Sequence, residues 1–194
     1  MPLSAADRHP VRTDHAAPER RSILIIGLGN SLRGDDGIGP ATIAMLRQRR
    51  LGSHVELLDV HQLTPELAHR LAAARLAIMV DASMTDPPGV IRCGLLEALD
   101  DRSVDAPLNH SLSPRVLFEM SQHLYGQSPR VYVFTVGGRS FGCVDRLSDD
   151  VSRAMPALME RIVRLMNWWD GRVATRSDTD AETASGDRME VYHA

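Results

Sequence analysis

The sequence predicts an α/β fold in three layers, with a mostly parallel twisted sheet and helices on both of its faces. Two observations carry this prediction. Short apolar runs typical of fully buried strands alternate with segments of helical period between residues 22 and 169. The first apolar run also ends in a glycine-rich loop that leads directly into a helical pattern. Such short strand–helix units are typical of a sheet covered on both faces by helices.

Five segments have the composition of strands. The run SILIIG at 22–27 is continuously apolar and closed by glycine, and a strand is expected next at 54–60. The run LAIMVD at 76–81 is closed by a carboxylate, and a fourth strand at 90–96 follows the turn signal at 87–89. The last strand, RVYVFTV at 130–136, is rich in β-branched and aromatic residues.

Helical period marks the segments between these strands. Helices are expected at 38–50, 64–74, 113–125 and 148–169. Proline stands at a first-turn position in the second and third of them, which favours a helix start there. Ligands bind beyond the carboxyl ends of the strands in sheets of this kind, so we expect a functional site at that edge.

Composition limits the organisation and the class of the protein. Residues 1–21 and 170–194 lack a core-forming pattern, so we expect a disordered N-terminal tail and a disordered acidic C-terminal tail around one domain at 22–169. A net charge of −3 argues against a nucleic-acid partner. No apolar run approaches the roughly 20 residues that span a bilayer, and the N-terminus lacks a secretory pattern. We therefore expect a cytoplasmic protein without a membrane partner.

The glycine-rich loop after the first strand suggests a phosphate-binding turn, but its details argue against one. Leu32 occupies the place of the third glycine of GxGxxG, and the chain contains no lysine for a GxxxxGK[ST] motif. Asp35 and Asp36 also stand where a phosphate needs bare N–H groups. Asp59, at the end of the second predicted strand, is the one feature suited to a ribose. A nucleotide-binding oxidoreductase therefore remains as an alternative.

Three polar residues follow separate elements at the predicted ligand-binding edge. One of Asp35 and Asp36 suffices as a helix cap, which leaves the second carboxylate, Asp36, free to bind a cation. Asp81 ends the third predicted strand, and His110 precedes the third predicted helix. Two carboxylates and one imidazole form a plausible open site for a divalent transition metal.

These residues lie in motifs that resemble a known family. The stretches ILIIGLGNSLRGDDGIGP, VDAS and NHSLSP are similar to those of the hydrogenase maturation endopeptidases. The resemblance covers residues 22–167 and implies an endopeptidase that removes the C-terminal extension of a nickel–iron hydrogenase large-subunit precursor. That cleavage completes maturation of the hydrogenase after nickel has been inserted.

The resemblance also implies how the reaction is controlled. Asp36, Asp81 and His110 match the positions at which the family contacts nickel, and that nickel is supplied by the substrate. No organic cofactor and no catalytic residue separate from the metal site are implied. A non-catalytic nickel chaperone remains the alternative to a peptidase.

One segment departs from the commonest pattern of this family. Many members carry Asp-Gly-Gly-Thr after the second strand, whereas this chain has His61, Gln62, Leu63 and Thr64 at the corresponding place. The His-Gln-Leu variant resembles the branch that serves bidirectional NAD(P)-coupled hydrogenases, and the segment is implied in substrate recognition. Thr64 is also expected to cap the following helix.

The segment at 138–142 matches the GxSxG pattern of a nucleophile elbow. No helix clearly begins at Ser140, and the only histidine that follows it is in the C-terminal tail. We therefore predict a glycine-rich turn at 138–142 rather than a nucleophile.

Overall fold

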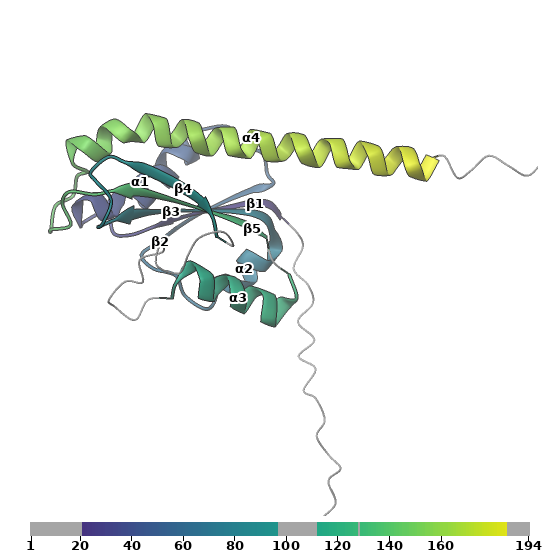
Figure 1. Ribbon diagram of the computed structural model, residues 1–194, viewed down its shortest axis with the longest axis horizontal. Helices are drawn as coiled ribbons and strands as arrows, with labels where there is room; N and C mark the ends of the chain where they lie inside the picture. Colours follow the sequence, from purple (N-terminus) through teal and green to yellow (C-terminus); the bar gives the residue numbers. More distant parts are fainter. Residues whose placement is uncertain (1–20, 97–111, 128, 186–194) are drawn as a thin grey trace, which may run out of the picture.

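A five-stranded sheet forms the centre of the protein (Figure 1). The structure is a computed structural model that describes residues 21–96, 112–127 and 129–185, and the side chains of 23–96, 112–127 and 129–172. The strands lie in the order β2-β1-β3-β5-β4. All neighbouring pairs are parallel except β4 and β5, which are antiparallel. Their bounds are Arg21–Leu28 for β1, Val55–Val60 for β2, Ala74–Ser83 for β3, Ile91–Leu95 for β4 and Arg130–Gly137 for β5.

Helices cover both faces of this sheet, which confirms the predicted three-layer α/β fold (Figure 1). Helix α1 (Ile38–Arg47) and helix α4 (Asp149–Ser185) lie on one face. Helix α2 (Leu67–Ala73) and helix α3 (Pro114–Tyr125) lie on the other and contact each other. A short 3-10 helix, η1 (Gly34–Gly37), directly precedes α1.

Strand β1 shows why the chain forms this sandwich. Its apolar side chains alternate between the two faces: Ile23 and Ile25 pack with α1 and α4, while Leu24 and Ile26 pack with α2 and α3. All four are fully buried or nearly so, and each contributes about 1.5–3 kcal/mol of apolar transfer free energy. A strand buried on both faces requires the continuous apolar run that the sequence contains.

Helix α4 differs from the prediction at its C-terminal end. The sequence predicted a helix that ends at 169, whereas α4 continues to Ser185 and projects beyond the sheet (Figure 1). Residues 170–185 contain no proline and a single glycine, Gly171, so no residue type in the segment forces the helix to end. Residues 1–20 and 186–194 lie outside the described residues.

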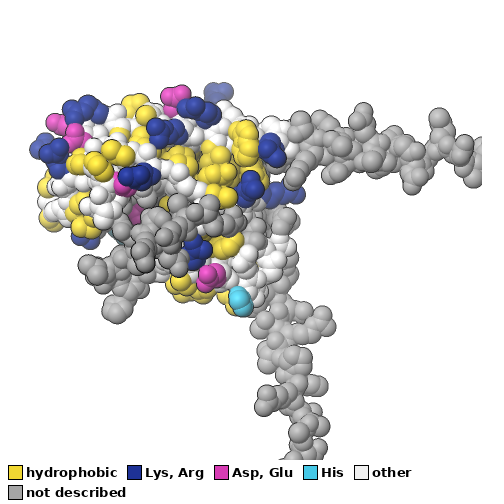
Figure 2. Space-filling model, viewed as in Figure 1, with side chains coloured by type: hydrophobic (Ala, Val, Ile, Leu, Met, Phe, Trp, Pro, Cys, Tyr) yellow, Lys and Arg dark blue, Asp and Glu magenta, His cyan; other side chains and the backbone are white. Residues whose placement is uncertain are grey.

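Local ion pairs lie along the outer surface of α4. Arg153 contacts Asp150 at 2.6 Å, and Arg164 contacts Glu160 at 3.3 Å. On the face seen in Figure 2, arginines are dispersed among apolar and uncharged side chains. Within the described part of the chain, no helix combines the length and the apolar character needed to cross a membrane.

Candidate functional site

The strand order locates the ligand-binding edge. Strand β2 lies on one side of β1, and β3 lies on its other side, followed by β5 and β4. The connection after β1 therefore leads toward β2, whereas the connection after β3 leads in the opposite direction along the sheet. The two connections diverge at the carboxyl ends of β1 and β3. In an open parallel sheet, such a point opens the crevice in which ligands bind. Gly27 of β1 is paired with Val80 of β3, which places the loop after β1 next to Asp81. The two predicted carboxylates therefore come from the two elements that flank this crevice.

The loop after β1 holds Asp36 in a defined position. Oδ2 of Asp36 accepts a hydrogen bond from the backbone N–H of Asn30 at 2.9 Å, and the Asn30 side chain in turn accepts one from Leu32 N–H at 2.9 Å. Gly29 has a φ of 117°, and a Cβ there would overlap the backbone oxygen of Asp36. The glycine therefore allows the loop to close tightly on Asp36. The carboxylate is half-buried at the edge of the sheet.

Asp81 lies near the end of β3 in a less polar environment. Its Oδ1 accepts a hydrogen bond from the backbone N–H of Ala82 at 2.8 Å. Burial raises the pKa of Asp81 to about 6, the Ala82 hydrogen bond opposes this rise, and the negative charge of Asp36 adds to it. The repulsion shows that the two carboxylates share one electrostatic environment. A cation between them would relieve both the burial cost and the repulsion.

The third predicted ligand, His110, lies outside the described residues, so its place in this site stays a prediction. Among the described residues, no three side chains of His, Cys, Asp or Glu gather closely enough to hold a metal ion. The described part of the site therefore supplies two oxygen donors, Asp36 and Asp81.

Asp35 does not have the role that the sequence suggested. It was expected to cap the helix, but the N-cap of α1 is Gly37, and no side chain bonds there. Asp35 is instead fully buried, and its carboxylate accepts backbone hydrogen bonds from Arg139, Ser140 and Ser148. Burial raises the pKa of Asp35, but these N–H donors outweigh it and hold the pKa below its usual value. Its partners lie more than 100 residues away in sequence, so no local pattern could reveal them.

The GxSxG segment takes part in the same contact. Strand β5 ends at Gly137 and the next helix begins at Asp149, so Ser140 lies on a long connection and not on a strand-to-helix elbow. The Ser140 backbone both donates to the Asp35 carboxylate and accepts from Asp35 N–H, at 2.9 and 2.8 Å. The segment therefore forms part of a structural contact, and residues 138–142 are irregular backbone with bends at Arg139 and Gly142 in place of the predicted turn.

The segment predicted for substrate recognition is divided between surface and core. His61 and Gln62 are exposed directly after β2, and Thr64 is half-buried. Leu63 is buried and packs in the core on the α2 and α3 side. Thr64 does not cap α2, which begins at Leu67, because a turn formed by the Thr64 carbonyl and Leu67 N–H precedes the helix. Within the segment, His61 and Gln62 are the side chains most accessible to a partner.

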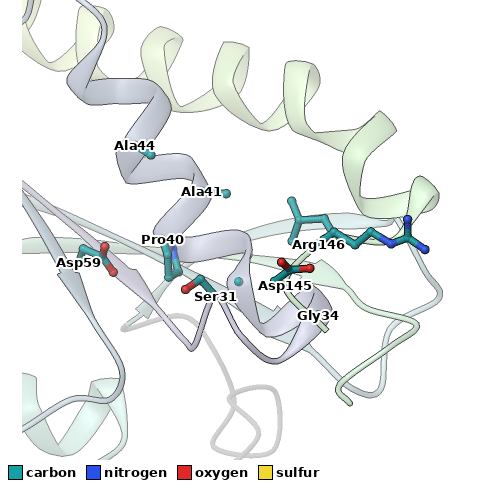
Figure 3. A pocket seen from close by; sticks show the side chains of 10 residues that line it. Ser31, Gly34, Pro40, Ala41, Ala44, Asp59, Asp145 and Arg146 are labelled. Atoms are coloured by element: carbon teal, nitrogen blue, oxygen red, sulfur yellow. The ribbon is translucent and has the colours of Figure 1, made fainter. Parts of the chain in front are cut away.

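Beside η1 lies a shallow pocket of about 300 Å³. Figure 3 shows small residues of the loop and of α1 along its floor, with Asp59 at one end and Asp145 and Arg146 near the other. Asp59 is exposed there, near the end of β2. The pocket therefore borders both the loop that carries Asp36 and the strand that leads to His61.

Two apolar side chains in the segments after β1 and β3 are exposed, and the sequence analysis did not single them out. Leu32, after β1, is 61% exposed, and Met84, after β3, is 75% exposed. Their sequence signal is weak, because an isolated apolar residue in a loop is common on protein surfaces.

Comparison of the sequence with known proteins yields one curated relative and no matching family model. The relative is a protein of Methanocaldococcus jannaschii that carries the provisional name of hydrogenase maturation protease. It is 29% identical over 154 residues, which cover 75% of this chain and 96% of the relative.

Comparison of the fold leads to the same group of proteins. The hydrogenase maturating endopeptidase HybD from E. coli matches with a TM-score of 0.62 at 24% identity, over 75% of this chain and 92% of its own. The maturation protease HycI from Thermococcus kodakarensis matches with a TM-score of 0.62 at 20% identity, over 76% and 94%. An endopeptidase from Escherichia coli matches with a TM-score of 0.57 at 26% identity, over 73% and 89%. The resemblance noted in the sequence motifs is therefore confirmed.

Proposed function

We propose that this protein is an endopeptidase that removes the C-terminal extension from the large-subunit precursor of a nickel–iron hydrogenase, in the cytoplasm, after nickel insertion. The observation that carries the proposal is the pair of carboxylates, Asp36 and Asp81, at the carboxyl edge of a sheet that matches hydrogenase maturation proteases. The named activity of these relatives is proteolysis in hydrogenase maturation.

In this proposal the nickel belongs to the substrate. Asp36 and Asp81, together with His110, contact the nickel that the precursor already holds. Carboxylate oxygens are hard donors that bind nickel more weakly than cysteine thiolates do, so an ion held by thiolates of the precursor would stay with the precursor. The ion then serves as the signal that the precursor is ready, and it can polarise a peptide carbonyl as a Lewis acid. No organic cofactor takes part.

The polypeptide of the precursor needs a surface as well as an ion. Leu32, in the loop after β1, and Met84, directly after β3, are exposed apolar side chains, and we assign to them an apolar contact with the precursor. His61 and Gln62 are exposed directly after β2, close in sequence to Asp59, which lines the pocket in Figure 3. We assign to these two residues the choice among precursors, with a bidirectional NAD(P)-coupled hydrogenase as the expected partner.

The test is incubation with a purified, nickel-loaded large-subunit precursor, with the product mass measured by intact mass spectrometry. A single cut that releases a C-terminal peptide supports the proposal. Asp36→Asn and Asp81→Asn should leave the precursor uncut while retaining the far-ultraviolet circular dichroism of the parent. Glu160→Gln, which changes an exposed carboxylate of α4 outside the pocket lining, is the matched control and should cut normally. Tight nickel binding by the isolated chain without any cleavage would indicate a nickel chaperone instead.

A further inference from the structure

The first aspartate of the GDDG segment forms a buried contact that the reaction itself does not use. Oδ2 of Asp35 accepts the backbone N–H groups of Arg139 and Ser140 at 2.7 and 2.9 Å, and Oδ1 accepts that of Ser148 at 2.7 Å. We call this arrangement, the Asp35 carboxylate with the amides of Arg139, Ser140 and Ser148, the Asp35 clamp. It joins η1 to both ends of the connection between β5 and α4.

Backbone contacts extend the clamp along η1. Asp35 N–H donates to the Ser140 carbonyl at 2.8 Å, and Gly34 N–H donates to the Val144 carbonyl at 2.6 Å. Arg33 forms a further bridge with Val144. Gly34 has a φ of 61°, and a Cβ there would lie against the Ser140 carbonyl, so the two segments are in close contact.

These long-range contacts add to the hydrogen bond between Asn30 N–H and Asp36 in holding η1, because a four-residue helix has few stabilising contacts of its own. No side chain caps the start of η1. Asp36 lies in the middle of this turn, next to Asp35 in sequence. The two carboxylates have different surroundings: Asp35 is fully buried against the β5–α4 connection, whereas Asp36 is half-buried and close enough to Asp81 to repel it.

We propose that Asp35 is a positioning residue: the Asp35 clamp fixes η1 against the β5–α4 connection and thereby holds the Asp36 carboxylate in register with Asp81. This inference rests on the proposed function, since the reaction is what requires that register. A catalytic or metal-contacting group displaced by about 1 Å can lose about 100-fold in rate. The clamp therefore gives the first aspartate of the pair, Asp35, a positioning role, whereas the second, Asp36, contacts the metal.

Asp35→Asn tests the clamp with almost no change in side-chain volume. An amide offers one acceptor oxygen and one NH₂ donor. If the amide oxygen still accepts the N–H groups of Arg139 and Ser140, the NH₂ group faces the N–H of Ser148. Both of these groups are donors, so no hydrogen bond can form between them. The variant therefore releases at least one of the three amides while leaving the packing around residue 35 intact.

Cleavage of the nickel-loaded precursor is measured at a temperature at least about 20 °C below the Tm of the variant, where the folded state dominates. Amide hydrogen exchange of Arg139, Ser140 and Ser148 is followed in the same sample. We expect faster exchange at Ser148 and a kcat about 10- to 100-fold below that of the parent. Asp150→Asn is the matched control: the Asp150 carboxylate also contacts Arg139, but it pairs with the guanidinium group and not with the backbone N–H. It should keep kcat within about twofold.

A second variant covers the case in which Asp35→Asn does not fold. Cys143 is exposed in the β5–α4 connection and offers a ligation point for a synthetic 143–194 segment. Replacing the Ser148 amide by an ester in that segment deletes a single N–H of the clamp. We expect faster exchange of the two remaining amides and a lower kcat in the full-length ester protein.

The outcomes separate the clamp from the proposed function. If the parent cuts the precursor and a folded clamp variant cuts it at the parental kcat despite released amides, Asp35 has only a structural role and the inference is wrong. If the parent itself cuts no nickel-loaded precursor, the proposed function is wrong, and the positioning role falls with it.

Discussion

The buried, charged carboxylate of Asp81 lowers the stability of the fold at neutral pH, so we expect Asp81→Asn to be more stable than the parent. The pKa of Asp81 rises from 3.8 in the unfolded chain to about 6 in the folded protein, chiefly because of burial. At about 1.4 kcal/mol for each pH unit, this difference makes the charged carboxylate cost up to about 3 kcal/mol of folding free energy. The neutral amide avoids that cost. We expect the metal-free variant to melt up to about 6–12 °C above the parent at about pH 7, given the usual 2–4 °C for each kcal/mol in a chain of this size.

The sign of the pH dependence follows from the same shift. Between about pH 4 and pH 6 the folded state keeps a proton on Asp81 that the unfolded state has released. The stability gap between Asp81→Asn and the parent should therefore shrink as the pH falls from about 7 to about 4, and close below it. Measuring the gap between two variants removes the contributions of groups that both proteins share.

The assay is thermal or urea unfolding of both proteins across this pH range, with metal chelators present. Asp145→Asn, which removes an exposed carboxylate, is the control and should change Tm by less than about 2 °C. If Asp81→Asn is less stable than the parent at neutral pH, or if the gap does not depend on pH, the assignment of Asp81 as a destabilised functional carboxylate is refuted.

Three further substitutions or truncations test separate parts of the account. Gly39→Ala should lower the unfolding free energy by about 3 kcal/mol or more, because its methyl group would overlap the backbone of Leu28; a normal urea midpoint would contradict this. Ser140→Ala should cut precursor at the parental rate, since Ser140 contributes backbone atoms to the contact with Asp35; loss of cleavage would restore the serine-hydrolase alternative. Truncation after Arg172, which keeps the stacking of Arg172 on Trp168, should change the melting temperature by less than about 3 °C, and a larger loss would show that the projecting end of α4 packs on the domain.

The fold was predictable from the sequence because each strand carries its own signal. The continuous apolar runs of β1 and β3 reflect burial on both faces, and the structure buries them in that way. The extension of α4 past residue 169 was not predictable, because residues 170–185 lack the apolar periodicity by which the other helices were identified. The predicted boundary at 169 followed the apolar pattern, which is a signal of packing and not of helix.

The site was predictable only in part, because its residues are brought together by the topology. Asp36 follows β1 and Asp81 lies near the end of β3, so their common edge could be inferred from strand–helix alternation. Asp35 could not be assigned, because its partners belong to a connection more than 100 residues away. A helix cap was the simplest local explanation for a carboxylate before α1. In the structure, Asp35 instead accepts hydrogen bonds from backbone amides of the β5–α4 connection.

The claim that the substrate's own nickel is read by the Asp36–Asp81 site is tested most directly by one comparison. Nickel-loaded and nickel-free forms of the same large-subunit precursor are incubated with metal-depleted protein, and the product masses are followed over time. The account predicts a single C-terminal cut in the nickel-loaded precursor and none in the nickel-free form. Cleavage of both precursors at the same rate would contradict it and would require a catalytic group within this chain that does not depend on the metal.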